Sequence, residues 1–293
     1  MHARRRLALV LLLVGCATGD LDPEPGAGAR VEATIASADG VPIHYVASGR
    51  GEPALVFVHG WLGNAAWWRP VMERFAGQHR VVALDLAGHG GSGRGRTEWT
   101  VERFADDIAA VVDALDLREV VLLGHSMSGA ITVEAARRSP ERVVALVPVD
   151  TLQDADWDLP EETWQAFFGG LRADFPNAVE GFFRTMLVAP GSPPDVIDRL
   201  VAEARAADPT IAVPMLERAR EYDLRSALRE LRIPIHALEA EANPANLEVN
   251  RKYAPRFEAS TIPGVGHWPM LEAPAAFGDA LDRVLAELFR ARG

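Results

Sequence analysis

The chain has 293 residues, of which 48% are hydrophobic, and its 41 acidic residues against 30 Lys and Arg give a formal net charge of −11. This length accommodates one large α/β domain with an inserted subdomain and a well-buried core. An acidic chain offers no surface-wide positive field to phosphates, which argues against nucleic acid as a partner.

The first sixteen residues have the pattern of a bacterial export signal. Three consecutive Arg, residues 4–6, precede an apolar run over residues 7–14 that is too short to span a bilayer. The run ends in the letters LVGC at residues 13–16, which resembles the lipobox of bacterial lipoproteins, where the Cys is diacylated and becomes the mature N-terminus. An ordinary cleaved signal and a retained anchor are the alternatives. We expect export to the cell envelope, a lipid on Cys16 and a flexible tether over residues 17–30, with the folded domain membrane-anchored in the periplasm or outside the cell.

From residue 31 onward, short apolar strands alternate with helical segments. The first two strands are expected to pair as a hairpin, and the next four are continuously apolar, as strands buried on both faces of a parallel sheet are. A helix is predicted after Thr100, a suitable N-cap, because apolar residues recur on one face. This alternation predicts an α/β fold with a mostly parallel, doubly wound sheet, whose ligands bind beyond the carboxyl ends of the strands. The expected strands cover residues 31–37, 43–48, 54–58, 81–84, 120–123 and 143–149.

Between residues 151 and 230 the strand pattern stops and short amphipathic helical segments replace it. Strands resume at 235–238 and near 258–262, and a final helix is expected from Pro274 to Arg290. We therefore predict a core formed by residues 31–150 and 231–293, with residues 151–230 as a helical lid.

The segment around Ser126 is typical of a nucleophile elbow. An apolar strand runs into Gly124-His125-Ser126-Met127-Ser128-Gly129 and then into a helix. Such a turn holds the Ser in a strained conformation with its hydroxyl above the sheet, and it requires small neighbours. Ser128 breaks the strict G-x-S-x-G pattern, but its side chain is small. The sequence therefore predicts Ser126 as a nucleophile.

Acyl transfer also needs two N–H donors for the oxyanion, and two turns are expected to supply them. One donor is the backbone of Met127, and the other is that of Trp61, in a His-Gly-Trp turn that ends the strand at 54–58. His59 of that turn is interpreted as structural. The Gly-rich stretch from Asp85 to Gly93 lacks the spacing of a phosphate-binding loop and is interpreted as a turn near the entrance of the site.

His267 is the predicted base. It lies in a Gly-rich loop after the last strand and follows the nucleophile in the order Ser, acid, His. The other His residues lack metal-ligand spacing such as H-E-x-x-H, which argues against a metal mechanism.

Four motifs together resemble the α/β-hydrolase superfamily, over roughly residues 31–290. They are HGW at 59–61, DLAGHGGSG at 85–93, GHSMSG at 124–129 and GVGHWPMLEAP at 264–274. The resemblance implies a lid over the site and no cofactor. It does not specify the substrate.

The third member of the expected triad departs from the family pattern. The acid usually follows the strand after the lid, where this chain has Asn243, and an amide cannot neutralise an imidazolium. Asp150, at the end of the strand before the lid, is the preferred candidate, because some superfamily members have their acid at this position. Glu241 is the second candidate, and the absence of a working acid is the third possibility.

The function that these residues favour is hydrolysis of a carboxyl ester or similar acyl compound through an acyl-enzyme on Ser126. The aromatic residues of the lid predict a small, apolar acyl substrate, although lid packing is their simpler role. Alternative activities are a cofactor-free perhydrolase or haloperoxidase-like reaction and cleavage of an activated carbon–carbon bond. A ligand-binding protein with impaired catalysis is the alternative of another class.

Overall fold

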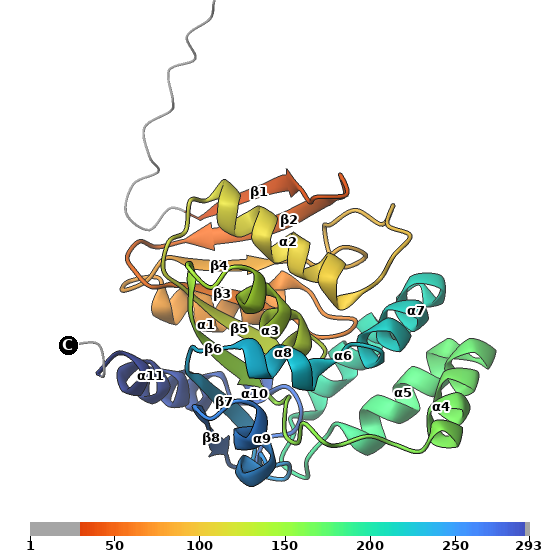
Figure 1. Cartoon of the computed structure of the whole chain (residues 1–293). Coiled ribbons are helices and arrows are strands. Elements are labelled where there is room, and N and C mark those ends of the chain that lie inside the picture. Colours follow the sequence, from red (N-terminus) through yellow and green to blue (C-terminus); the bar gives the residue numbers. More distant parts are fainter. Residues whose placement is uncertain (1–29, 291–293) are drawn as a thin grey trace, which may run out of the picture.

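The computed structural model describes residues 30–290, whose strands form one eight-stranded sheet (Figure 1). The strand order is β1-β2-β4-β3-β5-β6-β7-β8. β1 and β2 form an antiparallel hairpin, β2 is antiparallel to β4, and every pairing from β4 to β8 is parallel. The predicted α/β fold is confirmed. The strands are β1 Val31–Ala36, β2 Pro42–Ser48, β3 Ala54–Val58, β4 Val81–Leu84, β5 Val120–His125, β6 Val143–Val149, β7 Ile235–Ala240 and β8 Phe257–Ile262.

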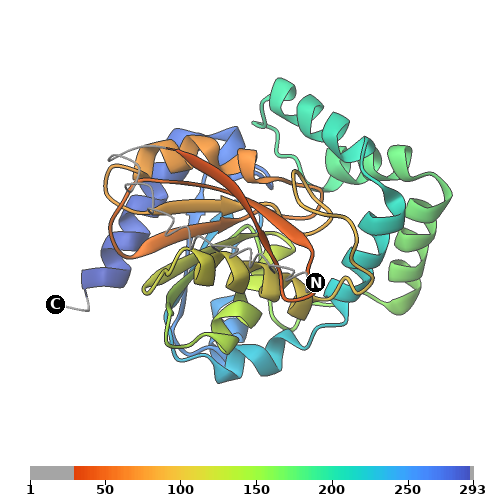
Figure 2. The ribbon, with the colours of Figure 1, turned by 90° about the horizontal axis from the view of Figure 1, so that it is seen from above.

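Helices cover both faces of this sheet (Figures 1 and 2). One face carries α1 (Arg69–Phe75) and α11 (Pro274–Arg290), which contact each other. The other carries α2 (Val101–Ala114), α3 (Ser128–Arg138) and α8 (Leu224–Glu230), which contact one another in that order. The short elements η1 (Ala65–Trp68), α9 (Leu247–Tyr253) and α10 (Pro269–Glu272) lie in connections.

The sequence pattern explains these positions. β3, β4 and β5 are buried along their whole length because helices cover both faces of the sheet. The side chain of Thr100 accepts a hydrogen bond from the N–H of Arg103 and so caps α2, as predicted. Phe104, Ile108 and Val111 form the buried stripe of that helix.

Four helices between β6 and β7 lie beyond one end of the sheet, at the right of Figures 1 and 2. They are α4 (Glu161–Ala173), α5 (Phe175–Met186), α6 (Pro194–Arg205) and α7 (Pro209–Arg220). We call these four helices and the loops between them the cap. Its buried side chains belong to the same hydrophobic core as the sheet and include Phe168, Phe175, Phe183 and Leu200. The helix α8, which belongs to the same insertion in sequence, packs against α3 instead.

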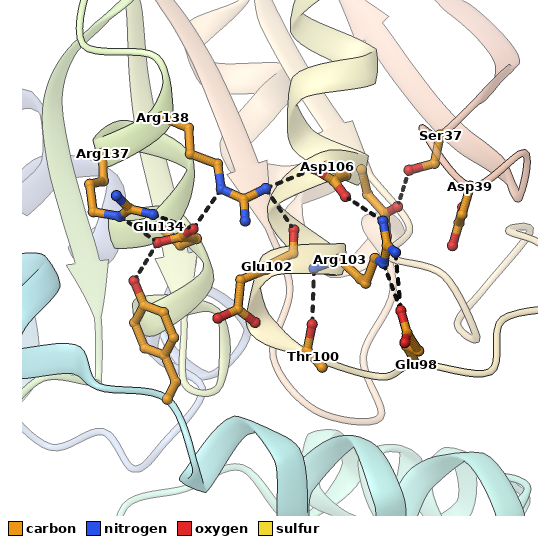
Figure 3. A network of polar contacts seen from close by, with 12 residues as sticks. Ser37, Asp39, Glu98, Thr100, Glu102, Arg103, Asp106, Glu134, Arg137 and Arg138 are labelled. Atoms are coloured by element: carbon orange, nitrogen blue, oxygen red, sulfur yellow. Dashed lines mark hydrogen bonds and ion pairs between the residues drawn. The ribbon is translucent and has the colours of Figure 1, made fainter.

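A polar network ties α3 to its neighbours (Figure 3). The buried carboxylate of Glu134 on α3 accepts hydrogen bonds from Arg137, from Arg138 and, at 2.7 Å, from the hydroxyl of Tyr222. Arg138 also contacts Asp106 on α2 at 2.8 Å. The helix that follows Ser126 is therefore fixed both to α2 and to the segment between α7 and α8.

The predictions that concern residues 1–29, including the export signal and the lipid on Cys16, lie outside the described residues. Among residues 30–290, no helix is both long and apolar enough to cross a membrane.

Candidate active site

Ser126 occupies a strained turn between β5 and α3. Its φ of 53° lies in the left-handed region that a residue with a side chain rarely adopts. Its N–H donates to the carbonyl of Val149 at 3.1 Å, which ties the turn to the end of β6. A Cβ at Gly124 would lie 2.4 Å from the carbonyl oxygen of Ser128, so the start of the turn admits only glycine. The local fold is that of a nucleophile elbow.

Ser128, which stands in place of the motif glycine, has a structural use for its hydroxyl. Its Oγ donates to the carbonyl of His59 at 2.5 Å and so joins the elbow to the His-Gly-Trp turn. The two turns touch: a Cβ on Gly60 would lie 2.9 Å from the Cβ of Ser126 and 2.7 Å from Nδ1 of His125. The substitution of Gly by Ser therefore adds a link between the two turns.

These two turns carry the N–H groups of Trp61 and Met127. Within residues 30–290 neither N–H donates to a protein acceptor, so both remain available to a ligand. The indole of Trp61 donates to the carbonyl of Ala212 on α7 at 2.8 Å, which fixes the turn against the cap.

Asp150 lies beside His267. His267 Nδ1 is 2.6 Å from Asp150 Oδ2, and Asp150 Oδ1 accepts the N–H of Ala240 at 2.9 Å. Asp150 is 3% exposed and has a φ of 44°, so its carboxylate is held in a buried, strained position at the end of β6. The described residues contain no hydrogen bond between His267 and the hydroxyl of Ser126. Such catalytic hydrogen bonds are often long without substrate and tighten when it binds.

The other two candidates for the acid lie elsewhere. Glu241 and Asn243 follow β7 on an exposed turn, and neither side chain makes a hydrogen bond within the described part of the chain. The end of β7 contributes only the N–H of Ala240 to this site. The structure thus brings Asp150, and neither Glu241 nor Asn243, to His267.

The remaining histidines near the site act as buried connectors. His59 is fully buried, its Nδ1 contacts the carbonyl of Gly60 at 2.7 Å, and its Nε2 accepts the N–H of Leu86 at 3.0 Å. Burial lowers its pKa, and burial followed by the proximity of His59 lowers that of His89 to about 3. Both rings are therefore neutral near pH 7. Within residues 30–290, no group of three or more His, Cys, Asp and Glu side chains is arranged to hold a metal ion.

Three side chains of the site were missed in the sequence. His125 Nε2 lies 2.7 Å from the carbonyl of His267, and the two rings are 4.6 Å apart. Glu239 is fully buried on β7, where burial first and the charge of Asp150 second raise its pKa to about 9. Glu272 accepts hydrogen bonds from the backbone on both sides of His267. The sequence did contain a signal for each. His125 is next to the predicted nucleophile, Glu239 interrupts an apolar strand, and Glu272 belongs to the motif GVGHWPMLEAP.

A series of aromatic contacts connects the cap surface to this site. Trp157 is 62% exposed, and its ring centroid lies 6.1 Å from that of Trp164. The series continues through three partly buried rings and the buried ring of Phe183 to Trp268, which packs 5.3 Å from His267. Its remaining contacts are Trp164–Phe167 at 6.3 Å, Phe167–Phe182 at 5.1 Å, Phe182–Phe183 at 6.2 Å and Phe183–Trp268 at 5.0 Å.

Comparison with known proteins agrees with this fold. The alpha/beta hydrolase fold family matches residues 53–274. The chain is 30% identical over 257 residues to a pimeloyl-(acyl-carrier protein) methyl ester esterase of Sodalis glossinidius, covering 82% of this chain and 96% of that protein. An esterase structure from Thermogutta terrifontis superposes with a TM-score of 0.75 at 26% identity, covering 89% and 99% of the two chains. A bromoperoxidase structure from Bacillus anthracis shares the fold, with a TM-score of 0.77 at 19% identity over 87% and 99%. The chain therefore belongs to the alpha/beta hydrolase fold family.

Proposed function

We propose that this protein is a serine hydrolase of carboxyl esters, with Ser126 as nucleophile, His267 as base and Asp150 as the acid that orients His267. The observation that carries the proposal is the 2.6 Å contact between Asp150 and His267, beside an elbow that holds Ser126 at a φ of 53°. This pairing also counts against a protein that only binds ligands, since that alternative depended on the lack of an acid.

The reaction follows from this arrangement. Ser126 Oγ attacks the ester carbonyl while His267 Nε2 takes the hydroxyl proton, and Asp150 offsets the charge on the imidazolium. The tetrahedral oxyanion lies within reach of the free N–H groups of Trp61 and Met127. His267 then returns the proton to the leaving alkoxide, which departs as the alcohol. Water attacks the acyl-enzyme by the same steps in reverse order and releases the acid.

The proposed substrate class is an ester with an apolar acyl group. Trp164, Phe167 and Phe182 are only partly buried, and they belong to the aromatic series that ends beside His267. Pockets for such groups are lined mainly by hydrophobic side chains with a few polar groups that fix orientation. The names of the two esterases above support an ester as the reacting group.

A chain-length series of p-nitrophenyl esters tests the activity and the depth of the pocket together. Ser126→Ala is expected to lower kcat by at least about 10⁴-fold without changing the melting temperature, because the hydroxyl supplies the covalent step. A fluorophosphonate should label Ser126 in the wild type, as located by mass spectrometry. Ser128→Ala is the matched control and should still be labelled. Ester binding without hydrolysis or labelling would refute the proposal.

A further inference from the structure

The backbone of the loop that carries His267 is held on every side. The N–H of His267 donates to the carbonyl of Leu187 in the cap at 2.8 Å. Its carbonyl lies 2.7 Å from Nε2 of His125, which can donate there as a neutral ring. The backbone of His267 therefore cannot shift without breaking one of these two contacts.

Glu272 holds the two neighbouring peptide groups. Its Oε2 accepts the N–H of Gly266 at 2.8 Å, and its Oε1 accepts the N–H of Trp268 at 3.0 Å. The carboxylate therefore holds the loop immediately before and immediately after His267. Hydrogen bonds of this kind to an ionised group are stronger than those between neutral groups.

The same carboxylate also reaches the cap. The hydroxyl of Ser192, in the loop between α5 and α6, donates to Glu272 Oε2 at 2.5 Å and accepts the N–H of Ala189 at 2.9 Å. The two loops are packed backbone to backbone, because a Cβ on Gly266 would lie 2.7 Å from the carbonyl oxygen of Leu187. The carboxylate of Glu272 thus binds both the cap loop and the loop that carries His267.

We propose that Glu272 is a positioning residue that couples the cap loop at residues 187–192 to the alignment of His267. The inference rests on the proposed function and adds a regulatory link to that site: the base is correctly aimed only while the cap loop is seated. Glu272 touches neither Ser126 nor His267 through its side chain, so its effect passes through the backbone at Gly266 and Trp268.

Glu272→Gln tests the coupling. The amide replaces one acceptor oxygen with an NH₂ group. This donor would face the backbone N–H of Gly266 or Trp268, so that one of the two hydrogen bonds is lost. We expect kcat to fall up to about 10²-fold with KM little changed, because a small displacement of a catalytic group is costly to turnover. Glu258→Gln, a surface carboxylate paired with Arg251, is the matched control and should keep wild-type kcat.

Ser192→Ala removes only the hydroxyl that links the cap loop to Glu272. We expect a smaller fall in kcat than for Glu272→Gln, and the double variant should be no worse than Glu272→Gln alone, since both changes break one connection. The matched control is Thr185→Val. It removes a cap hydroxyl that, among residues 30–290, donates only to the carbonyl of Gly181 in its own helix.

The inference is overturned if Glu272→Gln keeps kcat within about threefold of wild type, or if the losses of the two variants add. If Glu272→Gln does not fold, a Ser192→Ala variant with the kcat of Thr185→Val would overturn it equally. Wild-type hydrolysis that depends on Ser126 must be measured first. If that hydrolysis is missing, the proposed function is wrong. If it is present and Glu272→Gln leaves kcat unchanged, only the proposed coupling is wrong.

Discussion

Two buried carboxyl groups, those of Asp150 and Glu239, lie near the ends of the neighbouring strands β6 and β7 and have different surroundings. Asp150 Oδ1 accepts the N–H of Ala240, and its Oδ2 contacts His267 Nδ1. The Glu239 side chain accepts a hydrogen bond from Gln153 at 2.9 Å. Burial and the charge of Asp150 keep Glu239 protonated at neutral pH. Asp150, which contacts His267 Nδ1, is therefore the carboxyl that we propose as the triad acid.

Asp150→Asn should cost up to about 10⁴-fold in kcat with a much smaller effect on the melting temperature, because an amide neither selects the right tautomer of His267 nor offsets its charge. Glu241→Gln, the matched control on the exposed turn after β7, should turn over like the wild type. Steady-state kinetics on both purified variants decides between them. A nearly inactive Glu241→Gln beside an active Asp150→Asn would reverse the assignment of the acid.

At the scale of elements, the helix α3 helps to hold Ser126 in place, because α3 begins two residues after Ser126. Arg138 joins α3 to α2 (Figure 3), and Tyr222 joins α3 to the segment between α7 and α8. The hydrogen bonds from Arg137, Tyr222 and Arg138 outweigh the effect of burial and lower the pKa of Glu134. The network is thus anchored on a buried carboxylate that stays ionised.

Tyr222→Phe is expected to lower the free energy of unfolding by about 1 to 3 kcal/mol, since it removes a hydrogen bond to a buried charged group. The matched control is Tyr253→Phe, whose hydroxyl donates to Asp156 at an exposed position and should matter by less than about 1 kcal/mol. Urea unfolding of both variants measures the difference. Equal losses would show that the hydrogen bond from Tyr222 to Glu134 does not stabilise the protein in solution.

At the scale of the whole molecule, Glu239 makes folding stability depend on pH. Its pKa is about 9 in the folded protein against an ordinary value of 4.5. Between these values the unfolded chain has lost the proton and the folded chain keeps it, so the unfolded state binds fewer protons. Stability therefore falls as pH rises through this window, by at most about 1.4 kcal/mol per pH unit.

Glu239→Gln removes this dependence because an amide does not titrate. The gain in unfolding free energy over the wild type should be larger at about pH 8 than at about pH 6, as measured by urea unfolding at both values. Glu241→Gln, an exposed substitution just after β7, is the control. Its unfolding free energy should differ from that of the wild type by the same amount at both pH values. A Glu239→Gln effect that is independent of pH would mean that Glu239 titrates normally in the folded protein.

The attachment of the whole molecule to a membrane stays a prediction. It depends on the residues LVGC at positions 13–16, which lie outside the described part of the chain. Mass spectrometry of the N-terminus in the membrane fraction tests it, and an unmodified Cys16 there would refute the lipid.

The sequence by itself determined the fold class and two of the three proposed triad members. Strands buried on both faces need continuous apolar runs, and amphipathic helices need a regular stripe, so both patterns are readable along the chain. Ser126 and His267 could be proposed for a similar reason, because each lies in a turn with small neighbouring residues that is recognisable in the sequence.

The contacts of the proposed acid and of Glu272 could be seen only in the tertiary structure, because they join residues far apart in the chain. Asp150 and His267 are 117 positions apart, and Ser192 and Glu272 are 80 positions apart. The choice between Asp150 and Glu241 depends on how the turns after β6 and β7 direct two side chains at adjacent strand ends. Local pattern places both acids at the correct edge of the sheet, but only the packed backbone turns one inward and leaves the other in solvent.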